Sequence, residues 1–184
     1  MPILSFPRLA LFPTFIGRYI LETAVINGPV LLLGQRTTAD TVVGNTAAET
    51  TILTLDIPGG TLRTNGRINT VVYGSVDSDG SPSITFRFSF GGSTYVTSAV
   101  IPGNATDRSL MCIMDLIGAG SNTSTTMWTT IEGQDVTRAL AYANNATVDT
   151  SATQELKITV QWSVGSAARI YTADYAETFV LLPT

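Results

Sequence analysis

The amino-acid sequence predicts an all-β protein, an antiparallel β-sandwich with a jelly-roll-like topology. The 184-residue chain contains 29 Thr and 16 Gly, and β-branched residues favour strands whereas Gly favours turns. Short apolar segments separated by turn signals recur about every 8–14 residues, as they do in sandwiches and barrels. No long helical pattern lies between them, which disfavours a parallel α/β sheet. An immunoglobulin-like sandwich is the second choice of topology.

Two segments alternate strictly between apolar and polar residues. In residues 83–90 the alternation predicts that four apolar side chains share one buried face: Ile84, Phe86, Phe88 and Phe90. In residues 154–164 the same period predicts five inward side chains: Leu156, Ile158, Val160, Trp162 and Val164. Trp162 is therefore interpreted as a core residue and not as a platform for stacking sugars.

Turn signals bound the other expected strands, which are residues 50–57, 67–76, 93–101, 108–117, 123–132 and 169–182. Residues 108–117 are apolar on both faces, which predicts a central strand covered on both sides. Residues 136–149 are compatible with one or two helical turns or with a further strand. Gly91-Gly92 is expected to close a hairpin. The pattern around Trp128 does not decide which face its side chain occupies.

Residues 1–36 are predicted to form an extended, apolar N-terminal arm that precedes a sandwich domain at residues 37–184. Pro2, Pro7 and Pro13 interrupt this segment, and proline removes a backbone donor and disfavours a helix. Four aromatic residues of the arm are the predicted protein-interface residues: Phe6, Phe12, Phe15 and Tyr19. The alternative, of nearly equal weight, is that part of the segment adds a strand to the domain's own sheet, particularly residues 19–26 and 30–33.

Composition argues against several classes of function. The net charge of −4 disfavours binding to nucleic acid, and no apolar run is long enough for a transmembrane helix. The chain has no His, which removes the usual general base and most zinc sites. Cys112 lies in an apolar run and is expected to be buried. We therefore expect no catalytic residue, no cofactor and no metal site, and we expect the chain not to be an enzyme.

Carboxylates are the remaining candidates for a metal site or a catalytic site. Asp77-Ser78-Asp79-Gly80 resembles part of a calcium loop but lacks the closing Glu, so an ordinary Asx-rich turn is the favoured interpretation. A hydrolase that uses two dispersed carboxylates is the last alternative, because the acidic residues are spread along the chain.

A series of motifs resembles structural proteins of tailed bacteriophages. It begins with residues 41–52, continues with Asp56-Ile57-Pro58-Gly59-Gly60-Thr61-Leu62, and includes an alternating strand before Gly91-Gly92-Ser93-Thr94. It ends with residues 149–164, which contain Gln161-Trp162-Ser163. The series resembles the sandwich modules of decoration, or cement, proteins and of fibre or tail-tip proteins, and it covers about residues 37–182.

The resemblance implies a virion protein on the capsid surface, assembled as a homotrimer, whose partner is the major capsid protein or another virion protein. The leading expectation is a capsid decoration protein that stabilises the head by binding neighbouring capsid subunits. The alternative is a tail-fibre or receptor-binding module that recognises host surface glycans. The sequence does not distinguish a head location from a tail location.

Overall fold

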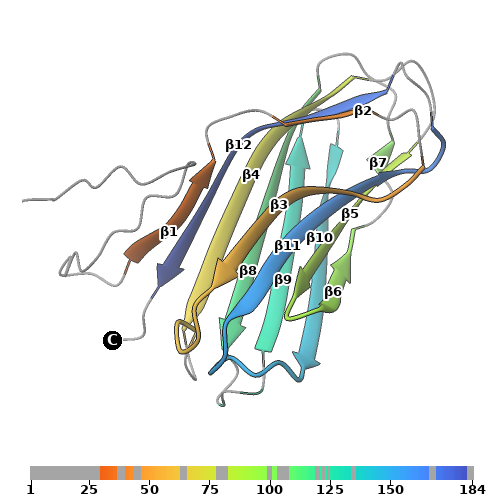
Figure 1. The fold of residues 1–184 in the computed structure, drawn as a ribbon. Coiled ribbons are helices and arrows are strands. Elements are labelled where there is room, and N and C mark those ends of the chain that lie inside the picture. The colour runs from red at the N-terminus through yellow and green to blue at the C-terminus, as the bar shows by residue number, and fades with distance from the viewer. Residues whose placement is uncertain are drawn as a thin grey trace, which may run out of the picture.

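The chain folds into two antiparallel β-sheets packed face to face (Figure 1). The computed structural model describes residues 30–36, 40–43, 47–62, 66–77, 83–98, 101–102, 108–118, 121, 123, 125–133, 136–165 and 169–181. In these residues all regular structure is β-strand, and no helix is present that could span a membrane. The predicted all-β, antiparallel sandwich is thus confirmed.

The larger sheet has seven strands in the order β1-β12-β4-β8-β9-β10, and β2 also pairs with β12. Its strands are β1 (Val30–Arg36), β2 (Asp40–Val43), β4 (Arg67–Asp77), β8 (Arg108–Gly118), β9 (Thr125–Gly133), β10 (Val136–Ala146) and β12 (Ile170–Leu181). The smaller sheet has five strands in the order β3-β11-β5-β6, and β7 also pairs with β5. Its strands are β3 (Thr50–Ile57), β5 (Ser83–Phe90), β6 (Ser93–Thr97), β7 (Ile101–Pro102) and β11 (Gln154–Trp162).

The chain passes repeatedly from one sheet to the other. The connections that change sheet are β2–β3, β3–β4, β4–β5, β7–β8, β10–β11 and β11–β12. This alternation wraps the chain around a single core, as the predicted jelly-roll-like topology requires. Figure 1 shows the smaller sheet in front of the larger one, with β11 and β5 at its centre.

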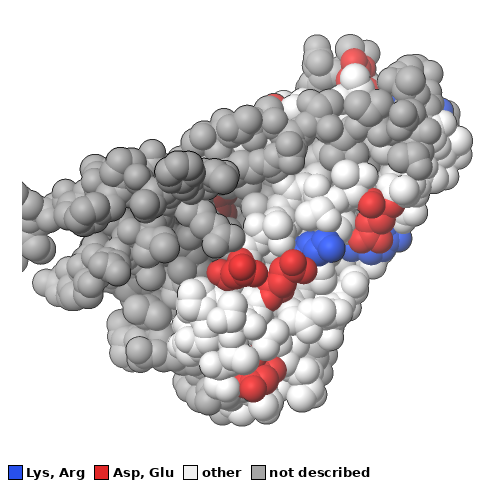
Figure 2. Space-filling model, viewed as in Figure 1, with Lys and Arg blue, Asp and Glu red and all other residues white. Residues whose placement is uncertain are grey.

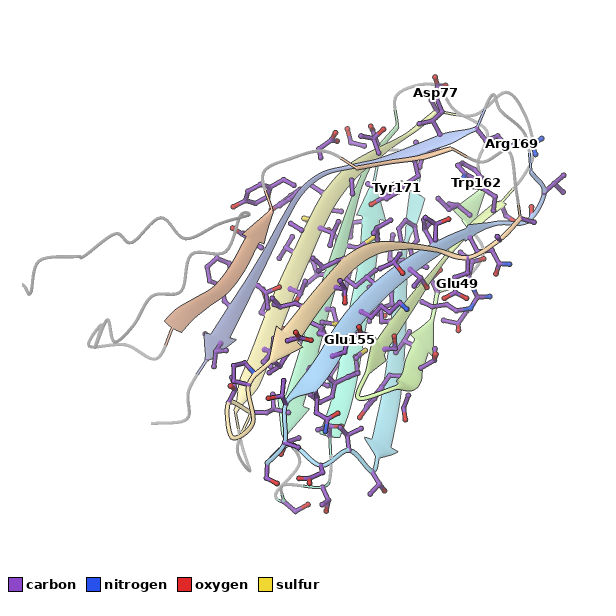
Figure 3. All side chains as sticks on the ribbon, in the orientation of Figure 1. Glu49, Asp77, Glu155, Trp162, Arg169 and Tyr171 are labelled. Atoms are coloured by element: carbon purple, nitrogen blue, oxygen red, sulfur yellow. The ribbon has the colours of Figure 1, made fainter. Side chains whose placement is uncertain are left out.

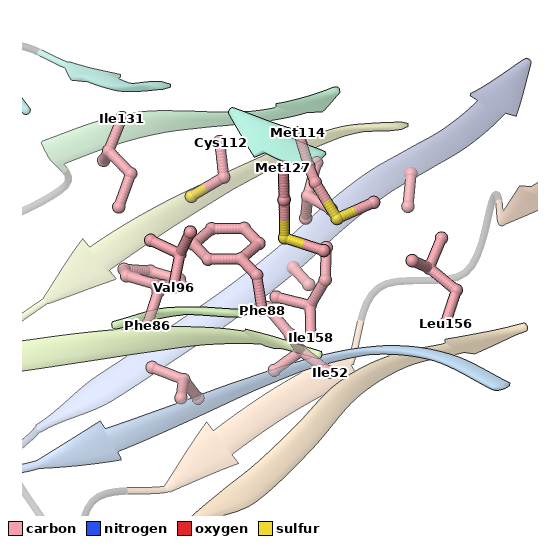
Figure 4. Close-up of a cluster of buried hydrophobic side chains, with 14 of the residues drawn as sticks. Ile52, Phe86, Phe88, Val96, Cys112, Met114, Met127, Ile131, Leu156 and Ile158 are labelled. Atoms are coloured by element: carbon pink, nitrogen blue, oxygen red, sulfur yellow. The ribbon is translucent and has the colours of Figure 1, made fainter. Parts of the chain in front are cut away.

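The core lies between the inner faces of the two sheets. β5 and β11 supply the predicted apolar row, since Phe86, Phe88 and Ile158 are fully buried. Figure 4 shows this layer meeting sulfur-containing side chains of the larger sheet: Cys112, Met114 and Met127. Methionine side chains are flexible and polarizable, so they fill the irregular space between aromatic rings.

The buried side chains of the two alternating strands, β5 and β11, were predicted almost completely. All four apolar side chains of β5 are buried, as are Leu156, Ile158, Val160 and Trp162 of β11. The prediction for Val164 was wrong, because β11 ends at Trp162 and Val164 is 57% exposed. Alternation constrains a side chain only while the strand continues, and the chain bends at Ser163 and Val164.

The strand pairing settles two points that the sequence left open. Residues 136–146 form β10, which pairs with β9 and excludes the helical interpretation. Residues 30–36, the last part of the predicted arm, form β1 and pair with β12, from Val30 opposite Leu181 to Arg36 opposite Ala176. The alternative of an added strand therefore holds for these residues, and among the described residues the sheet already includes Val30–Arg36.

The turns at one end of the sandwich are tied together by backbone hydrogen bonds. Gly60 N donates to Thr150 O over 2.8 Å, and Gly91 N donates to Glu155 O over 3.0 Å. Gly60, Gly91 and Gly92 have positive φ, which suits glycine in tight turns. The hydroxyl and backbone N–H of Ser151 both donate to Asp149 and hold the pKa of that carboxyl below its usual range.

Candidate functional site: the outer face of the larger sheet

The outer face of the larger sheet carries large apolar side chains that the sandwich core does not cover. Tyr73 on β4 is 42% exposed and Trp128 on β9 is 48% exposed. Six further outward side chains are half-buried: Val71, Met111, Ile113, Ile117, Tyr175 and Phe179. We refer to these eight residues of β4, β8, β9 and β12 as the apolar face.

Strand register explains why these residues share one surface. On β4, the even-numbered residues from Ile68 to Val76 are buried, so the odd-numbered ones point outward. β8 pairs with β4 so that Ile113 lies opposite Val71, and Met111 lies opposite Tyr73. Residues that are directly opposite in an antiparallel ladder have side chains on the same side of the sheet. Adjacent positions therefore hold Tyr175, Tyr73, Met111, Val71 and Ile113. Phe179 and Trp128 lie next to polar residues, among them Asn69 and Asp115.

A polar network lies within the apolar face. The Asp115 carboxylate accepts hydrogen bonds from Arg67 Nε over 2.8 Å and from Asn69 Nδ2 over 2.7 Å. A second Arg67 contact, Nη2 to Oδ2, measures 2.6 Å, so the ion pair is bidentate. Asp115 lies opposite Trp128 in the β8–β9 ladder. The exposed indole thus lies next to a carboxylate that Arg67 and Asn69 hold in place.

A recess of about 340 Å³ is lined by residues of β4, β8, β9 and β12, among them Tyr73, Met111, Glu132 and Asp174. Tyr73 packs against Tyr175 with ring centroids 6.1 Å apart. Asp174 occupies a register shift of β12 between Ala173 and Tyr175, and it is exposed. Bulges of this kind redirect a side chain at the surface of a sheet.

The outer face of the smaller sheet has a different character. Its outward positions carry hydroxyl and charged groups, and Figure 2 shows acidic and basic side chains next to each other on this side. Glu49 accepts a hydrogen bond from Thr159 Oγ1 and lies 3.3 Å from Arg87 Nη1. Thr54 Oγ1 donates to Glu155 over 3.1 Å. Figure 3 shows Glu49 and Glu155 in front of the smaller sheet. The outer face of the smaller sheet is therefore polar, whereas that of the larger sheet combines large apolar side chains with a polar network.

The sequence-predicted interface residues Phe6, Phe12, Phe15 and Tyr19 lie outside the described residues. Cys112 is buried as expected, and burial raises the pKa of its thiol well above the usual range. In the described segments, no three Cys, Asp or Glu side chains gather closely enough to hold a metal ion. Of the Asp77-Ser78-Asp79-Gly80 turn only Asp77 is described, at the end of β4.

Comparison with known proteins gives fold-level similarity alone. No family model and no curated protein matches the chain. Lectin II from Ulex europaeus superposes with a TM-score of 0.42 at 9% identity, over 91% of this chain and 97% of the lectin. Peanut lectin gives a TM-score of 0.39 at 8% identity, over 88% and 95% of the two chains. An alginate lyase from Aplysia kurodai gives 0.35 at 10% identity, over 84% and 91%. Similarity at this level does not bear on ligand or activity.

The apolar face was not predicted from the sequence, although residues 108–117 carry a signal of it. Residues 108–117 were predicted to be covered on both sides because both faces of the segment are apolar. β8 is central in its sheet and its even-numbered residues are buried, but Met111, Ile113 and Ile117 on the other side are only half-buried. The second apolar row of β8 therefore lies at the surface of the described sandwich.

Proposed function

We propose that this chain is a structural protein of a bacteriophage virion, a capsid decoration protein that stabilises the head by binding major capsid subunits. The observation that carries the proposal is the apolar face. Soluble monomers rarely expose contiguous apolar patches beyond a few hundred Å² without a functional reason. Covering Tyr73 and Trp128 with a neighbouring subunit would remove apolar area from water and favour association.

The size of the apolar face supports a contact with a protein. Four strands spaced about 4.8 Å apart, over about eight residues of about 3.3 Å each, span roughly 500 Å². A stable protein interface buries roughly 800 Å² on each partner. The part of the outer face that holds the apolar face, with polar positions such as Arg67 and Asp115 included, would therefore supply more than half of the contact. The N-terminal arm, with its four aromatic residues, would supply the remainder in this proposal.

The composition of the face also suits a protein interface. Trp, Tyr and Arg are the residues most enriched at energetically dominant interface positions, and Trp128, Tyr73 and Arg67 all point outward here. The bidentate Arg67–Asp115 pair is already formed before docking, so little side-chain entropy would be lost there. The proposal keeps the expected homotrimer and the position on the capsid surface.

One observation favours a second candidate, a receptor-binding module for host glycans. Trp128, whose face the sequence left open, is exposed beside Asp115, to which Asn69 donates a hydrogen bond. An exposed indole can stack on the apolar face of a sugar ring, while amide and carboxylate groups bond to its hydroxyls. This candidate requires that Trp128 contacts a glycan and not a capsid subunit.

Co-sedimentation with phage particles assembled without this chain tests the proposal. The purified protein should sediment with such particles, and Trp128→Ala should weaken binding by about thirtyfold, the usual effect of removing a dominant interface tryptophan. Lys157→Ala, on the outer face of the smaller sheet, is the matched control and should bind like the wild type. Circular dichroism would verify that both variants are folded.

Two results would contradict the proposal. One is that the wild-type protein fails to sediment with the particles; the other is that Trp128→Ala and Lys157→Ala bind equally well. If Trp128→Ala instead abolishes binding to a glycan array or to host cells and leaves particle binding intact, the receptor-binding candidate replaces the decoration role.

A further inference from the structure

One edge of β10 has no partner strand among the described residues. β10 is the last strand on the path of the larger sheet, and it pairs with β9 alone. Neighbouring residues of a strand direct their N–H and C=O groups to opposite sides. Every second residue of β10 therefore presents a backbone donor and acceptor that β9 does not use. Such an edge is a template on which a further strand can pair.

The sequence of β10 lacks the features that usually protect an edge strand. Protected edges are very short or carry charged residues or proline. β10 has eleven residues, and Arg138 is its only charged residue. The edge strands of the smaller sheet are better protected, because β6 has five residues, and β3 contains Asp56 and is followed by Pro58. Register shifts lie near both ends of β10, but the ladder from Ala139 to Asn144 is regular, so this stretch is open to pairing.

The sequence of β10 is complementary to itself in one register. An antiparallel pair of identical strands has a two-fold axis at its centre, so a residue on the axis lies opposite its own copy. β10 runs from Val136 to Ala146, and only the register centred on Ala141 pairs all eleven residues. This register places Leu140 opposite Tyr142 on both sides of the axis. Cross-strand neighbours of this kind, one aliphatic and one aromatic, stabilise a sheet.

We propose that two copies of this chain associate through their β10 edges, antiparallel and centred on Ala141. Arg138 then lies opposite Asn144 of the second copy, so no like charges meet. The two-fold axis is perpendicular to the joined sheet, because opposite residues of an antiparallel pair share a face. The apolar faces of the two copies therefore lie on the same side. This contact goes beyond the proposed function and does not depend on it.

A two-fold contact determines how many copies the free protein contains. Each chain has one β10 edge, so the contact joins copies in twos and then is complete. The expected homotrimer needs a three-fold contact through another surface, and with both contacts the assembly would contain six copies. The inference therefore requires an even number of copies in solution.

Analytical ultracentrifugation of the full chain, without particles, tests the inference. The wild-type protein should sediment as an even number of copies. Tyr142→Lys should weaken the association by about tenfold, because the contact with Leu140 that it removes occurs twice in a two-fold pair. Leu140→Glu should weaken it to a similar extent, and the double variant should recover it, since opposite charges then meet across the axis. Thr51→Lys, at an exposed position of the edge strand β3, is the matched control and should associate like the wild type.

Hydrogen exchange is a second measurement that needs no variant. The amides of β10 should exchange more slowly as the protein concentration rises, whereas those of β3 should not change. A wild-type protein that sediments as one copy or as three copies would overturn the inference, as would unchanged association in Tyr142→Lys. A double variant that stays dissociated would overturn the register centred on Ala141. All of these measurements are made without particles, so their failure is distinct from failure of the decoration role.

Discussion

At the scale of single residues, Gly74 is the position where the larger sheet can least accept a side chain. It occupies an inward position on β4, next to Tyr171 of β12, whose ring packs edge-on against Phe86 with centroids 5.2 Å apart. A Cβ atom at Gly74 would lie 2.4 Å from the Thr172 carbonyl oxygen and 2.7 Å from the Tyr171 hydroxyl. The glycine therefore makes room for a buried tyrosine.

Gly74→Ala should lower the free energy of unfolding by about 1–3 kcal/mol, the usual cost of overpacking a core. The cause would be the displaced backbone of β12, since a carbonyl oxygen cannot rotate away as a side chain can. Ser75→Ala, at the adjacent outward position, should change stability by less than about 0.5 kcal/mol. Urea denaturation of both variants measures the difference, and equal stabilities would contradict the packing described here.

Predictions for single residues were correct where apolar and polar residues alternate within a strand, and wrong where that strand had ended. Trp162 was correctly assigned to the core because it continues the alternation of β11. Val164 was wrongly placed inside because the sequence gives no mark of the strand end two residues earlier. Trp128 could not be placed because it lies between Met127 and a threonine, and threonine occurs on both faces of β9.

At the scale of elements, β8 shows most clearly how the ladders separate core from surface. Met114 is fully buried, whereas its neighbour Ile113 is on the apolar face and half-buried. The sequence predicted the central position of β8 correctly, because apolar residues on both faces indicate cover on both sides. The sequence could not show that nothing in the described sandwich packs on the outer face of β8. Apolar residues are favoured at a buried position whether the chain itself or another molecule buries it.

Threonine substitutions at these two neighbouring positions test the assignment of faces. Met114→Thr should cost about 2–5 kcal/mol of stability, because it creates a cavity and buries a hydroxyl. Ile113→Thr should cost less than about 1 kcal/mol, since threonine suits an outward strand position. Thermal or urea unfolding compares the two variants. If Ile113→Thr is as destabilising as Met114→Thr, the apolar face is covered within the monomer and is not available for docking.

β1 and β10 mark the limit of sequence-based assignment of elements. β1 lies in an apolar run without a clear period, and β10 mixes alanine, asparagine and larger residues. Both pair with a single neighbouring strand along the path of the larger sheet, at its two ends. Edge strands take their structure mainly from the ladder of their neighbour, so their own sequence carries a weaker signal.

At the scale of the whole molecule, the outer faces of the two sheets differ in polarity. At one end of the sandwich, backbone hydrogen bonds hold the turns in place. The smaller sheet presents hydroxyls and paired charges, as a surface in water does (Figure 2). The larger sheet presents Tyr73, Trp128 and a second apolar row. This asymmetry is what the proposed docking through a single face would use.

Image reconstruction of the phage particle at side-chain resolution tests the docking role most directly. The account predicts density for the sandwich on the capsid, with Trp128 and Tyr73 buried against a neighbouring subunit and with the smaller sheet facing solvent. Density that shows the larger sheet exposed to solvent, or a particle without this chain, would contradict it.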